Sequence, residues 1–444
     1  GEQDLLFSSD DTDVVVVKGN GTGGANWVLT GLAVGAGEAN VTVSFSYKDY
    51  LKDYTDPTSS HVVKVEKSFK VVVNENKELQ SFSIKKIGDL VFGEESIVVV
   101  SPSPSSAEFD VTKVSLVIKS DLGLSDDWTG TYTVTESADG QLNFSIKPLV
   151  PGAVKVMVYY DGELKSNEES RDVAVRLDLA SGWQWRTLNY GSIESASMND
   201  AFGGNSLIEV RSQSELLYND SQIGYFGGLA ENGLSQDMCY KIKMSNEVNS
   251  YLLENGSLIQ GTEYGLNKGW TWLPNPYLYE RSLSNLTGAS SGDMIVSKGD
   301  GFAQFDGEAW EGSLTTLTPG EGYLYRTASE GGLISFANEF DLAPVTEDAG
   351  NARVRSLARR MDSRPWQYDA SQWSDNMSMV AVADNIDGLA DYSIGAYVNG
   401  ECRGEGIVSG GRLFITVHGK VGEQVLPFSA LAVKDNLFME EHPG

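Results

Sequence analysis

The motif Gly-Trp-x-Trp occurs twice in this chain, first in SGWQWRTLNY at 181–190 and again in KGWTWLPNPY at 268–277. The two motif glycines, Gly182 and Gly269, lie 87 residues apart. Self-similarity at a fixed spacing is the signature of a duplicated structural module. A chain of 444 residues also exceeds the roughly 250–300 residues at which a single core stops growing. We therefore expect a series of small units.

The alignment of the two copies extends beyond the motif. The further aligned pairs are Ile208 with Ile295, Arg211 with Lys298 and Tyr218 with Phe305 at the same offset, and Tyr240 with Tyr323 at an offset of 83. Each copy is predicted to contain a GWxW strand, a short helix, a strand, an aromatic hairpin and a Tyr-rich strand. The helices are expected at Ser195 to Phe202 and Ser282 to Thr287, and Trp310 is expected opposite Phe226 of the first copy.

The first 176 residues alternate short β-branched runs with turn signals. Val41, Val43 and Phe45 alternate with Thr and Ser, as a strand with one solvent-exposed face requires. Five more strand candidates follow one another at spacings near ten residues, at 95–104, 113–121, 128–137, 141–149 and 152–162. This pattern predicts two tandem Ig-like β-sandwiches, at 1–75 and 76–176.

The chain after the second copy begins with a basic stretch. Five arginines fall within 345–365 of an otherwise acidic chain, which favours a linker. Strand candidates follow at 377–384, 392–406, 412–419 and 422–435. The chain is thus predicted to be mainly β: two sandwiches, a duplicated β-rich module with minor α content at 177–268 and 269–344, and a linker plus C-terminal β domain at 345–444.

Charge and cysteine content limit the possible partners and frameworks. The 33 basic and 62 acidic residues give a net charge of −29. Nucleic-acid binding is not expected, because affinity for phosphates comes from Lys and Arg. No apolar run approaches the roughly 20 residues of a transmembrane helix. The two cysteines, Cys239 and Cys402, fall in different predicted units, so a disulfide framework is not expected.

Two stretches carry a resemblance to known proteins. The run WVLTGLAVGAGEANVTVSFSY followed by EKSFKVVV, within 27–73, resembles the second half of a bacterial Ig-like domain. The order of two Ig-like units, a duplicated GWxW module and the strands MVAVAD, SIGAYVNGECRG and LFITVHG resembles secreted or surface-attached modular proteins of the Bacteroidetes type. This resemblance implies cell adhesion, no catalytic motif, and an extracellular or outer cell surface location after removal of an export signal.

Residues that carry catalysis or bind metal are scarce. The three histidines, His61, His418 and His442, come without a Gly-x-Ser-x-Gly elbow, so a Ser-His-Asp hydrolase is not expected. They also cannot supply a zinc site with two lone cysteines, and no cofactor is expected. Calcium stays open because carboxylates abound, although ADNIDGL at 383–389 matches an EF-type loop only in part. An acid-pair glycoside hydrolase stays open because that reaction needs only two carboxylates.

Aromatic side chains are the candidate ligand contacts. The two tryptophans of each motif stand at i and i+2, so in a strand both lie on one face, where they either stack on sugar rings or fill the core of the copy. Trp310, flanked by Glu308 and Glu311, is predicted to be more exposed. The candidate ligand-binding residues are Trp270, Trp272, Trp310, Tyr323 and Tyr325.

These observations favour a non-catalytic extracellular surface protein that serves cell adhesion or ligand capture. Its partner would be a protein or glycan on a host or neighbouring cell. An alternative is an accessory polysaccharide-binding protein that uses aromatic stacking in the GWxW modules. A second alternative is the acid-pair glycoside hydrolase.

Overall fold

The structure is a computed structural model of the chain, and it describes most of the sequence. The described residues are 6–20, 28–33, 35–49, 61–74, 77–124, 128, 130–137, 140–259, 261–327, 331–342, 368–382, 388, 392–420, 423, 428–434 and 437–443. The prediction of a mainly β chain is confirmed, because strands dominate and the helices are short. Among the described residues, no helix is both long enough and apolar enough to span a membrane.

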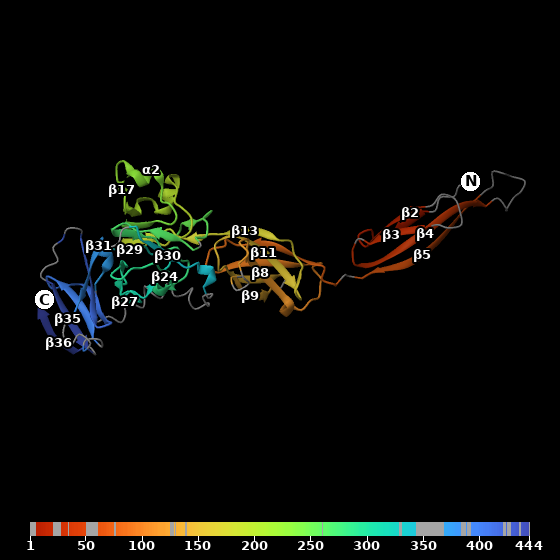
Figure 1. Cartoon of the computed structure of the whole chain (residues 1–444). Helices are drawn as coiled ribbons and strands as arrows, with labels where there is room; N and C mark the ends of the chain where they lie inside the picture. Colours follow the sequence, from red (N-terminus) through yellow and green to blue (C-terminus); the bar gives the residue numbers. More distant parts are fainter. Residues whose placement is uncertain are drawn as a thin grey trace, which may run out of the picture.

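The N-terminal unit contains one three-stranded and one two-stranded sheet (Figure 1). The strands are β1 (Leu6–Ser9), β4 (Gly37–Asp49) and β5 (His61–Val73) in the first sheet, and β2 (Val15–Asn20) and β3 (Val28–Ala33) in the second. Its buried core is small and consists of Val14, Val15, Ala39 and Val41. Val41 is buried as expected, but the alternation breaks after it, because Ser44 is buried whereas Val43 and Phe45 are only half-buried.

The second unit is a sandwich of two four-stranded sheets. One sheet has the order β6 (Ser81–Ile87), β7 (Ser96–Ser103), β10 (Leu142–Lys147) and β9 (Thr131–Glu136). The other contains β12 (Glu163–Leu164), β11 (Gly152–Tyr160), β13 (Glu169–Val173) and β8 (Val114–Ser120). The inner faces meet in a core that includes Val100, Phe144 and Val156, each fully buried. All five predicted strands of this region are present, because each alternates apolar and polar residues at period two.

The two GWxW copies form five-stranded sheets with the same strand order. The first sheet is β15 (Gly182–Thr187), β19 (Cys239–Met244), β16 (Leu207–Arg211), β17 (Leu216–Asp220) and β18 (Gly224–Phe226). The second sheet is β22 (Gly269–Leu273), β29 (Tyr323–Thr327), β25 (Met294–Val296), β26 (Phe302–Phe305) and β27 (Trp310–Gly312).

Smaller elements surround these sheets. The first copy has the short helices η3 (Ser195–Ser197), α1 (Met198–Ala201), η4 (Gly204–Ser206) and α2 (Gly228–Asn232). The second has η5 (Leu283–Asn285) and η6 (Glu339–Asp341), with the short strands β21 (Glu263–Gly265), β23 (Arg281–Ser282), β24 (Leu286–Thr287), β28 (Thr316–Leu317) and β30 (Leu333–Phe336). The strands β14 (Val175–Arg176) and β20 (Leu252–Leu253) pair beside the first copy.

The two helix predictions need correction. The expected helix at Ser195 to Phe202 is split into η3 and α1, and it ends one residue early. The expected helix at Ser282 to Thr287 is a single 3-10 turn that passes into β24. The chain turns extended there because β24 pairs with β30 and buries Leu286.

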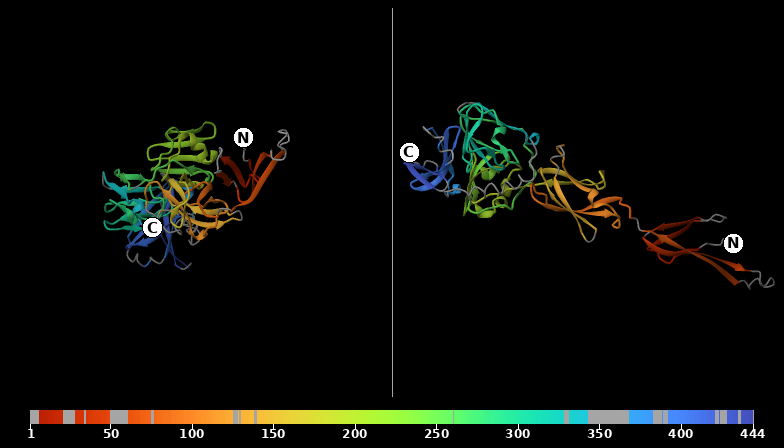
Figure 2. Two further views of the ribbon diagram at one scale, coloured as in Figure 1. Left: turned by 90° about the vertical axis from the view of Figure 1, so that its right-hand side faces the viewer. Right: turned by 90° about the horizontal axis from the view of Figure 1, so that it is seen from below.

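The C-terminal unit is one antiparallel sheet. Its order is β31 (Asp375–Ala381), β34 (Arg412–Gly419), β33 (Glu401–Ser409), β32 (Ser393–Val398), β35 (Phe428–Lys434) and β36 (Leu437–Pro443), and it follows the short helix η8 (Ala370–Gln372). The predicted linker at 345–365 lies outside the described residues. In two views the N-terminal unit lies at one end of an elongated molecule, and the GWxW copies and the C-terminal sheet are grouped at the other (Figures 1 and 2). We call that group the head.

An aromatic joint connects the second sandwich to the head. Trp128 of the sandwich lies 5.7 Å, between ring centroids, from Tyr279 and 5.0 Å from Phe340. The hydroxyl of Tyr279 donates a hydrogen bond of 2.5 Å to the carbonyl oxygen of Leu149. These contacts bury Trp128 and Tyr279 almost completely.

Candidate functional site

The matching registers of the two copies show which residues are equivalent. Trp183 pairs with Lys243 on β19, and Trp270 pairs with Arg326 on β29, which keeps the GWxW motifs aligned at the offset read from the sequence. Further along the sheets the expected offset is wrong. The register places Val210 at the position of Ile295, because insertions and deletions lie in the connections.

The same ladder corrects the expected partner of Trp310. In the second copy Trp310 pairs with Phe305, and in the first copy Tyr225 pairs with Asn219 at the corresponding positions. Tyr225, and not Phe226, is therefore the counterpart of Trp310.

Two of the predicted ligand-binding residues are core residues. Tyr323 and Tyr325 both have an exposed fraction of 0%. The hydroxyl of Tyr323 accepts a hydrogen bond of 2.7 Å from the backbone amide of Thr318, and the hydroxyl of Tyr325 donates to Asp293 at 2.8 Å. The prediction that these tyrosines contact a ligand is wrong, because both sides of this sheet are covered and both hydroxyls are satisfied internally.

The tryptophans of the GWxW motifs differ in exposure. Trp183 and Trp185 are buried, with exposed fractions of 8% and 2%. Trp272 is half-buried, whereas Trp270 is 44% exposed but lines neither of the two cavities described below. The motif therefore serves mainly to pack the copies.

The buried ammonium group of Lys241 contacts the rings of both Trp185 and Trp272. Its Nζ atom lies 4.8 Å from the ring centroid of Trp185 and 4.7 Å from that of Trp272, and it donates to Asp375 Oδ1 at 2.5 Å. Burial alone would raise the pKa of Asp375, but hydrogen bonds from Lys241 and Ser374 outweigh burial and lower it. The cluster thus joins both copies and the C-terminal sheet, and the ring of Trp272 forms one side of it.

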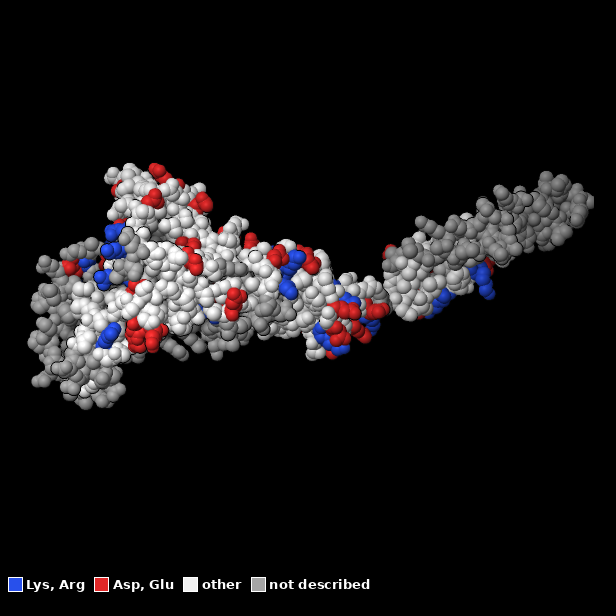
Figure 3. Space-filling view, viewed as in Figure 1, with Lys and Arg blue, Asp and Glu red and all other residues white. Residues whose placement is uncertain are grey.

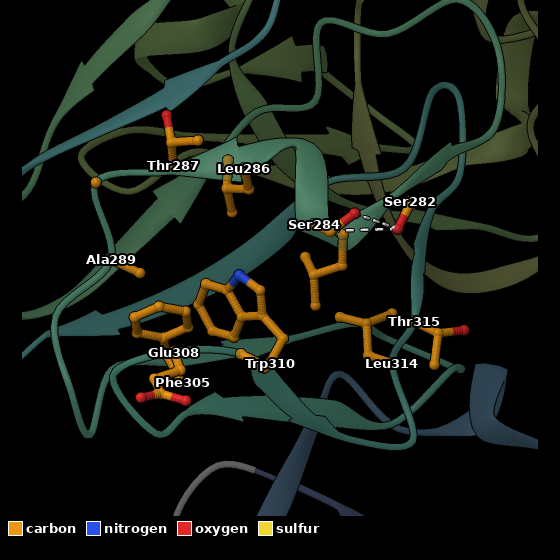
Figure 4. Close-up of a pocket in the computed structure, with 13 residues that line it drawn as sticks. Ser282, Ser284, Leu286, Thr287, Ala289, Phe305, Glu308, Trp310, Leu314 and Thr315 are labelled. Atoms are coloured by element: carbon orange, nitrogen blue, oxygen red, sulfur yellow. Dashed lines mark hydrogen bonds between the residues drawn. The ribbon is translucent and has the colours of Figure 1, made fainter.

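A cavity of about 490 Å³ lies beside Trp310 in the second copy (Figure 4). We call it the Trp310 pocket. Its lining comes from the end of β23, η5, β24 and the two residues after it, the β26–β27 hairpin and the start of the following connection, namely Ser282, Leu283, Ser284, Leu286, Thr287, Gly288, Ala289, Phe305, Glu308, Ala309, Trp310, Leu314 and Thr315. Figure 4 shows the indole of Trp310 between Phe305 on one side and Leu314 on the other.

The indole of Trp310 is fixed by other rings. Its centroid lies 5.2 Å from that of Phe305, and it meets Tyr325 edge to face at 6.1 Å. The indole Nε1 atom is buried and donates to no described residue. A buried indole N–H normally has a hydrogen-bond acceptor, so Trp310 carries a buried donor that protein groups in the described part of the chain leave unused.

Polar groups line the rim of the pocket. The hydroxyls of Ser282 and Ser284 are hydrogen-bonded to each other at 2.8 Å, and the side chains of Thr287 and Thr315 are exposed. The only charged residue of the lining is Glu308. This composition of one aromatic plate, several hydroxyls and one carboxylate is that of a binding pocket with a few convergent polar groups.

The hairpin loop at the pocket keeps a second negative charge nearby. The carboxylate of Asp306 accepts hydrogen bonds from the backbone amides of Ala309 and Glu308, and these bonds lower its pKa. Acidic side chains are gathered beside β27 on the face drawn in Figure 3. The lining itself contributes a single carboxylate, whereas glycoside hydrolysis uses a pair.

Comparison of the copies explains why the pocket is open. In the first copy helix α2 packs against η3, β17 and β18. These elements correspond to η5, β26 and β27 in the second copy, which border the pocket. The connections that differ between the copies begin at the equivalent residues Gly227 and Gly312. At either glycine a Cβ atom would strike a carbonyl oxygen of the paired strand. After this point the second copy is two residues shorter and extended, so no helix fills the space.

Only part of the lining of this pocket could be predicted from the sequence. Trp310 was expected to be accessible, and it is half-buried with one side on the cavity. The residues of η5 and β24 were missed as ligand contacts, because nothing local to Ser282 or Ser284 indicates that they face a hairpin more than twenty residues later. The comparison of connection lengths after Gly227 and Gly312 is the one signal that could have indicated an open space.

Metal binding is not supported by the described residues, in which no group of three or more His, Cys, Asp or Glu side chains is arranged to hold an ion. Of the calcium loop considered at 383–389, only Gly388 is described. His418 is buried and stacked 5.4 Å from Tyr368 and 6.4 Å from Trp373, and it is not part of the Trp310 pocket.

Comparisons with known proteins place few constraints on the chain. No protein-family model matches it, and no curated protein does. Similar solved structures include the Escherichia coli adhesin FdeC, at 14% identity over 58% of this chain and 82% of the adhesin, with a TM-score of 0.23. A Bacteroides ovatus protein, SGBP-B, solved with a mixed-linkage heptasaccharide, matches at 12% identity over 75% of this chain and 88% of its own, with a TM-score of 0.15.

Invasin, a bacterial integrin-binding protein, matches at 9% identity over 100% of this chain and 71% of its own, with a TM-score of 0.19. At these identities and scores the chain is not assigned to any of these folds.

Proposed function

We propose that this chain is a non-catalytic surface protein that captures a carbohydrate in the Trp310 pocket. The observation that carries the proposal is the open space beside Trp310, where the equivalent space of the first copy is filled by helix α2. The two copies thus differ beside this aromatic side chain, and the difference leaves one side of Trp310 on a cavity. Adhesion to a glycan-bearing surface is the broader role that such a site would serve.

A sugar ring fits the chemistry of the lining. The aliphatic C–H face of a pyranose packs on an aromatic plate, and its hydroxyls need donors and acceptors around the edge. Trp310 supplies the plate, and Ser282, Ser284 and Thr315 supply hydroxyls. The volume of about 490 Å³ lies within the range of roughly 300–1,000 Å³ usual for small-molecule pockets.

The charge of the pocket favours a neutral sugar over an acidic one. Glu308 is the only charged lining residue, and no Lys or Arg is present to pair with a uronate or sialate. A carboxylate brought close to Glu308 and the neighbouring Asp306 would be repelled.

The arrangement of the chain supports a role at a cell surface. The pocket belongs to the head, whereas the two sandwiches extend away from it (Figures 1 and 2). A protein fastened near its N-terminal unit would present the head at a distance from the point of attachment.

The proposal is tested by glycan-array screening of the whole chain, followed by calorimetry with the best neutral oligosaccharide. Trp310→Ala should weaken binding by about 2 kcal/mol or more, roughly 30-fold, as expected for a central aromatic contact. Trp270→Ala is the matched control, because Trp270 is an exposed tryptophan of the same copy outside the pocket. It should leave the affinity unchanged.

A second variant separates binding from folding. Ala289→Trp places a ring in the cavity without removing any core contact, and it should abolish binding while the melting temperature is retained. The proposal fails if no glycan is bound, or if Trp310→Ala and Ala289→Trp both bind as the parent does. Release of product from the bound oligosaccharide would instead support the glycoside-hydrolase alternative.

A further inference from the structure

A second cavity lies in the head, away from the Trp310 pocket. Its volume is about 510 Å³, and three stretches of the chain, together with Glu247, meet around it. The first is 178–186 of the first copy, the second comprises 298–300 and Glu321 of the second copy, and the third is 368–371 in front of the C-terminal sheet. We call it the junction cavity, since it exists only where these three parts are assembled.

The wall of the junction cavity is aromatic. Trp183 and Trp185 of the first GWxW motif both line it, and Tyr368 lines it from the C-terminal unit. These rings are held in place, because Trp185 Nε1 donates to the carbonyl oxygen of Ser374 at 3.2 Å and Tyr368 stacks on His418. A preformed aromatic wall favours a ligand that contains a ring.

The charged groups of the cavity are mostly acidic. Its acidic residues are Asp178, Glu247, Asp300, Glu321 and Asp369, and its basic residues are Arg186 and Lys298. The basic groups are already engaged by the protein: Arg186 donates to the carbonyl oxygen of Asp178, and Lys298 donates to that of Ala370 at 2.6 Å. The surplus of carboxylates leaves the cavity with a negative field.

Glu321 is a carboxyl group of this lining, and its charged neighbours are Arg186 and Glu280. No described residue donates a hydrogen bond to it. Burial raises its pKa to about 7, a nearby Arg186 opposes this shift, and Glu280 adds to it. A carboxyl group so placed gains from any cation that enters the cavity, because the ion pair forms in a partly desolvated setting.

We propose that the junction cavity binds a small organic cation, in which a ring packs against Trp183 and Tyr368 and an ammonium group pairs with Glu321. The inference is independent of the Trp310 pocket, since it rests on a different cavity and different residues. It also gives the first GWxW motif a role that the packing of the copies does not require.

A charge series on one ring tests this site. The probes are 2-phenylethylamine, 2-phenylethanol and 3-phenylpropanoate, titrated calorimetrically into the whole chain at pH 8, where Glu321 is largely ionised. The amine should bind roughly 10- to 100-fold more tightly than the alcohol, which is the gain expected from one charge-assisted hydrogen bond. The acid should not bind measurably.

Variants locate the effect. Glu321→Gln should bring the amine down to the affinity of the alcohol, and Glu231→Gln, an exposed acid on α2, should change nothing. The Ala289→Trp variant of the other pocket should keep amine binding, which separates the two sites. Equal binding of amine and alcohol, no binding of the amine, or full amine affinity in Glu321→Gln would each overturn the proposal.

Discussion

Replacement of Lys241 by methionine removes the charge that joins the three parts of the head. The ammonium group of Lys241 makes one hydrogen bond to Asp375 and stands over the rings of Trp185 and Trp272. Methionine retains the length of the side chain and its contact with both rings. The Lys241→Met variant therefore tests the charge and not the packing.

The expected cost follows from these contacts. The charge-assisted hydrogen bond contributes about 1.5–3 kcal/mol, and each partly desolvated cation–π contact about 1 kcal/mol. Sulfur–aromatic contacts of methionine return about 1 kcal/mol. Asp375 is left with the hydroxyl of Ser374 and a side chain that is 24% exposed, which limits the penalty for its lost partner. We expect a net loss of about 3 kcal/mol, or roughly 6–12 °C in the melting temperature.

The assay is urea unfolding of the whole chain followed by tryptophan fluorescence, with Lys243→Met as control. Lys243 lies on the same strand, 5.6 Å from the ring centroid of Trp183, and has no carboxylate partner among the described residues. Its replacement should cost less than about 1 kcal/mol. Adding Asp375→Asn to Lys241→Met should recover part of the loss, because the orphaned charge is removed. This reasoning would be refuted if Lys241→Met and Lys243→Met lost the same free energy of unfolding. It would also be refuted if the loss in the double variant were the sum of the losses in Lys241→Met and Asp375→Asn alone.

Two further predictions concern the cavities. Burial raises the pKa of Glu321 from 4.5 to about 7, so the folded protein favours the neutral acid. The neutral acid therefore contributes to stability below pH 4.5, and this contribution is lost as the pH rises toward 7. Glu321→Gln should therefore flatten the fall in stability between pH 5 and pH 8, measured by urea unfolding, and an unchanged slope would contradict the assignment. Gly312→Ala should destabilise the second copy by about 2 kcal/mol or more, since the new Cβ would lie 2.2 Å from the carbonyl oxygen of Phe302 at a φ of +147°. Gly299→Ala meets nothing within 4 Å and is the control; equal stability of the two variants would show that the backbone yields at Gly312.

Strands of the second sandwich could be predicted closely from the sequence. The interval 141–149 contains β10, and its residues alternate between buried and half-buried positions, as period-two patterning requires. This rule works where one face of a strand is covered and the other meets solvent. In the C-terminal sheet the strand β34 lies at the predicted interval 412–419, but it is buried at every residue from Phe414 to Gly419, so both of its faces are covered.

The alternation rule does not say which face is covered. In β25 the residues Met294, Ile295 and Val296 are all buried, so both faces of the second copy's sheet are packed. Tyr323 and Tyr325 were assigned to a binding face on the correct ground that they share a side, yet that side is core. Burial of this kind depends on partners distant in sequence, such as Thr318 and Asp293 for the two hydroxyls, and no local pattern reports it.

The pocket beside Trp310 was only half predictable for a related reason. An aromatic in a Gly- and Glu-rich hairpin indicates a surface position, and this led to Trp310. The cavity itself is created by what the chain omits after Gly312, where the first copy inserts α2 after Gly227. Such an omission becomes visible only when the strand registers of the two copies are known.

The aromatic joint of Trp128, Tyr279 and Phe340 has a mechanical consequence. Contacts between domains of one chain usually permit relative motion unless the interface is apolar and well packed. Here interlocked rings and the hydrogen bond from Tyr279 to Leu149 oppose both twisting and sliding. A force applied to a ligand bound at Trp310 would therefore be transmitted to the second sandwich with little bending at this interface. The contacts at the joint also fix the angle between the head and the sandwich.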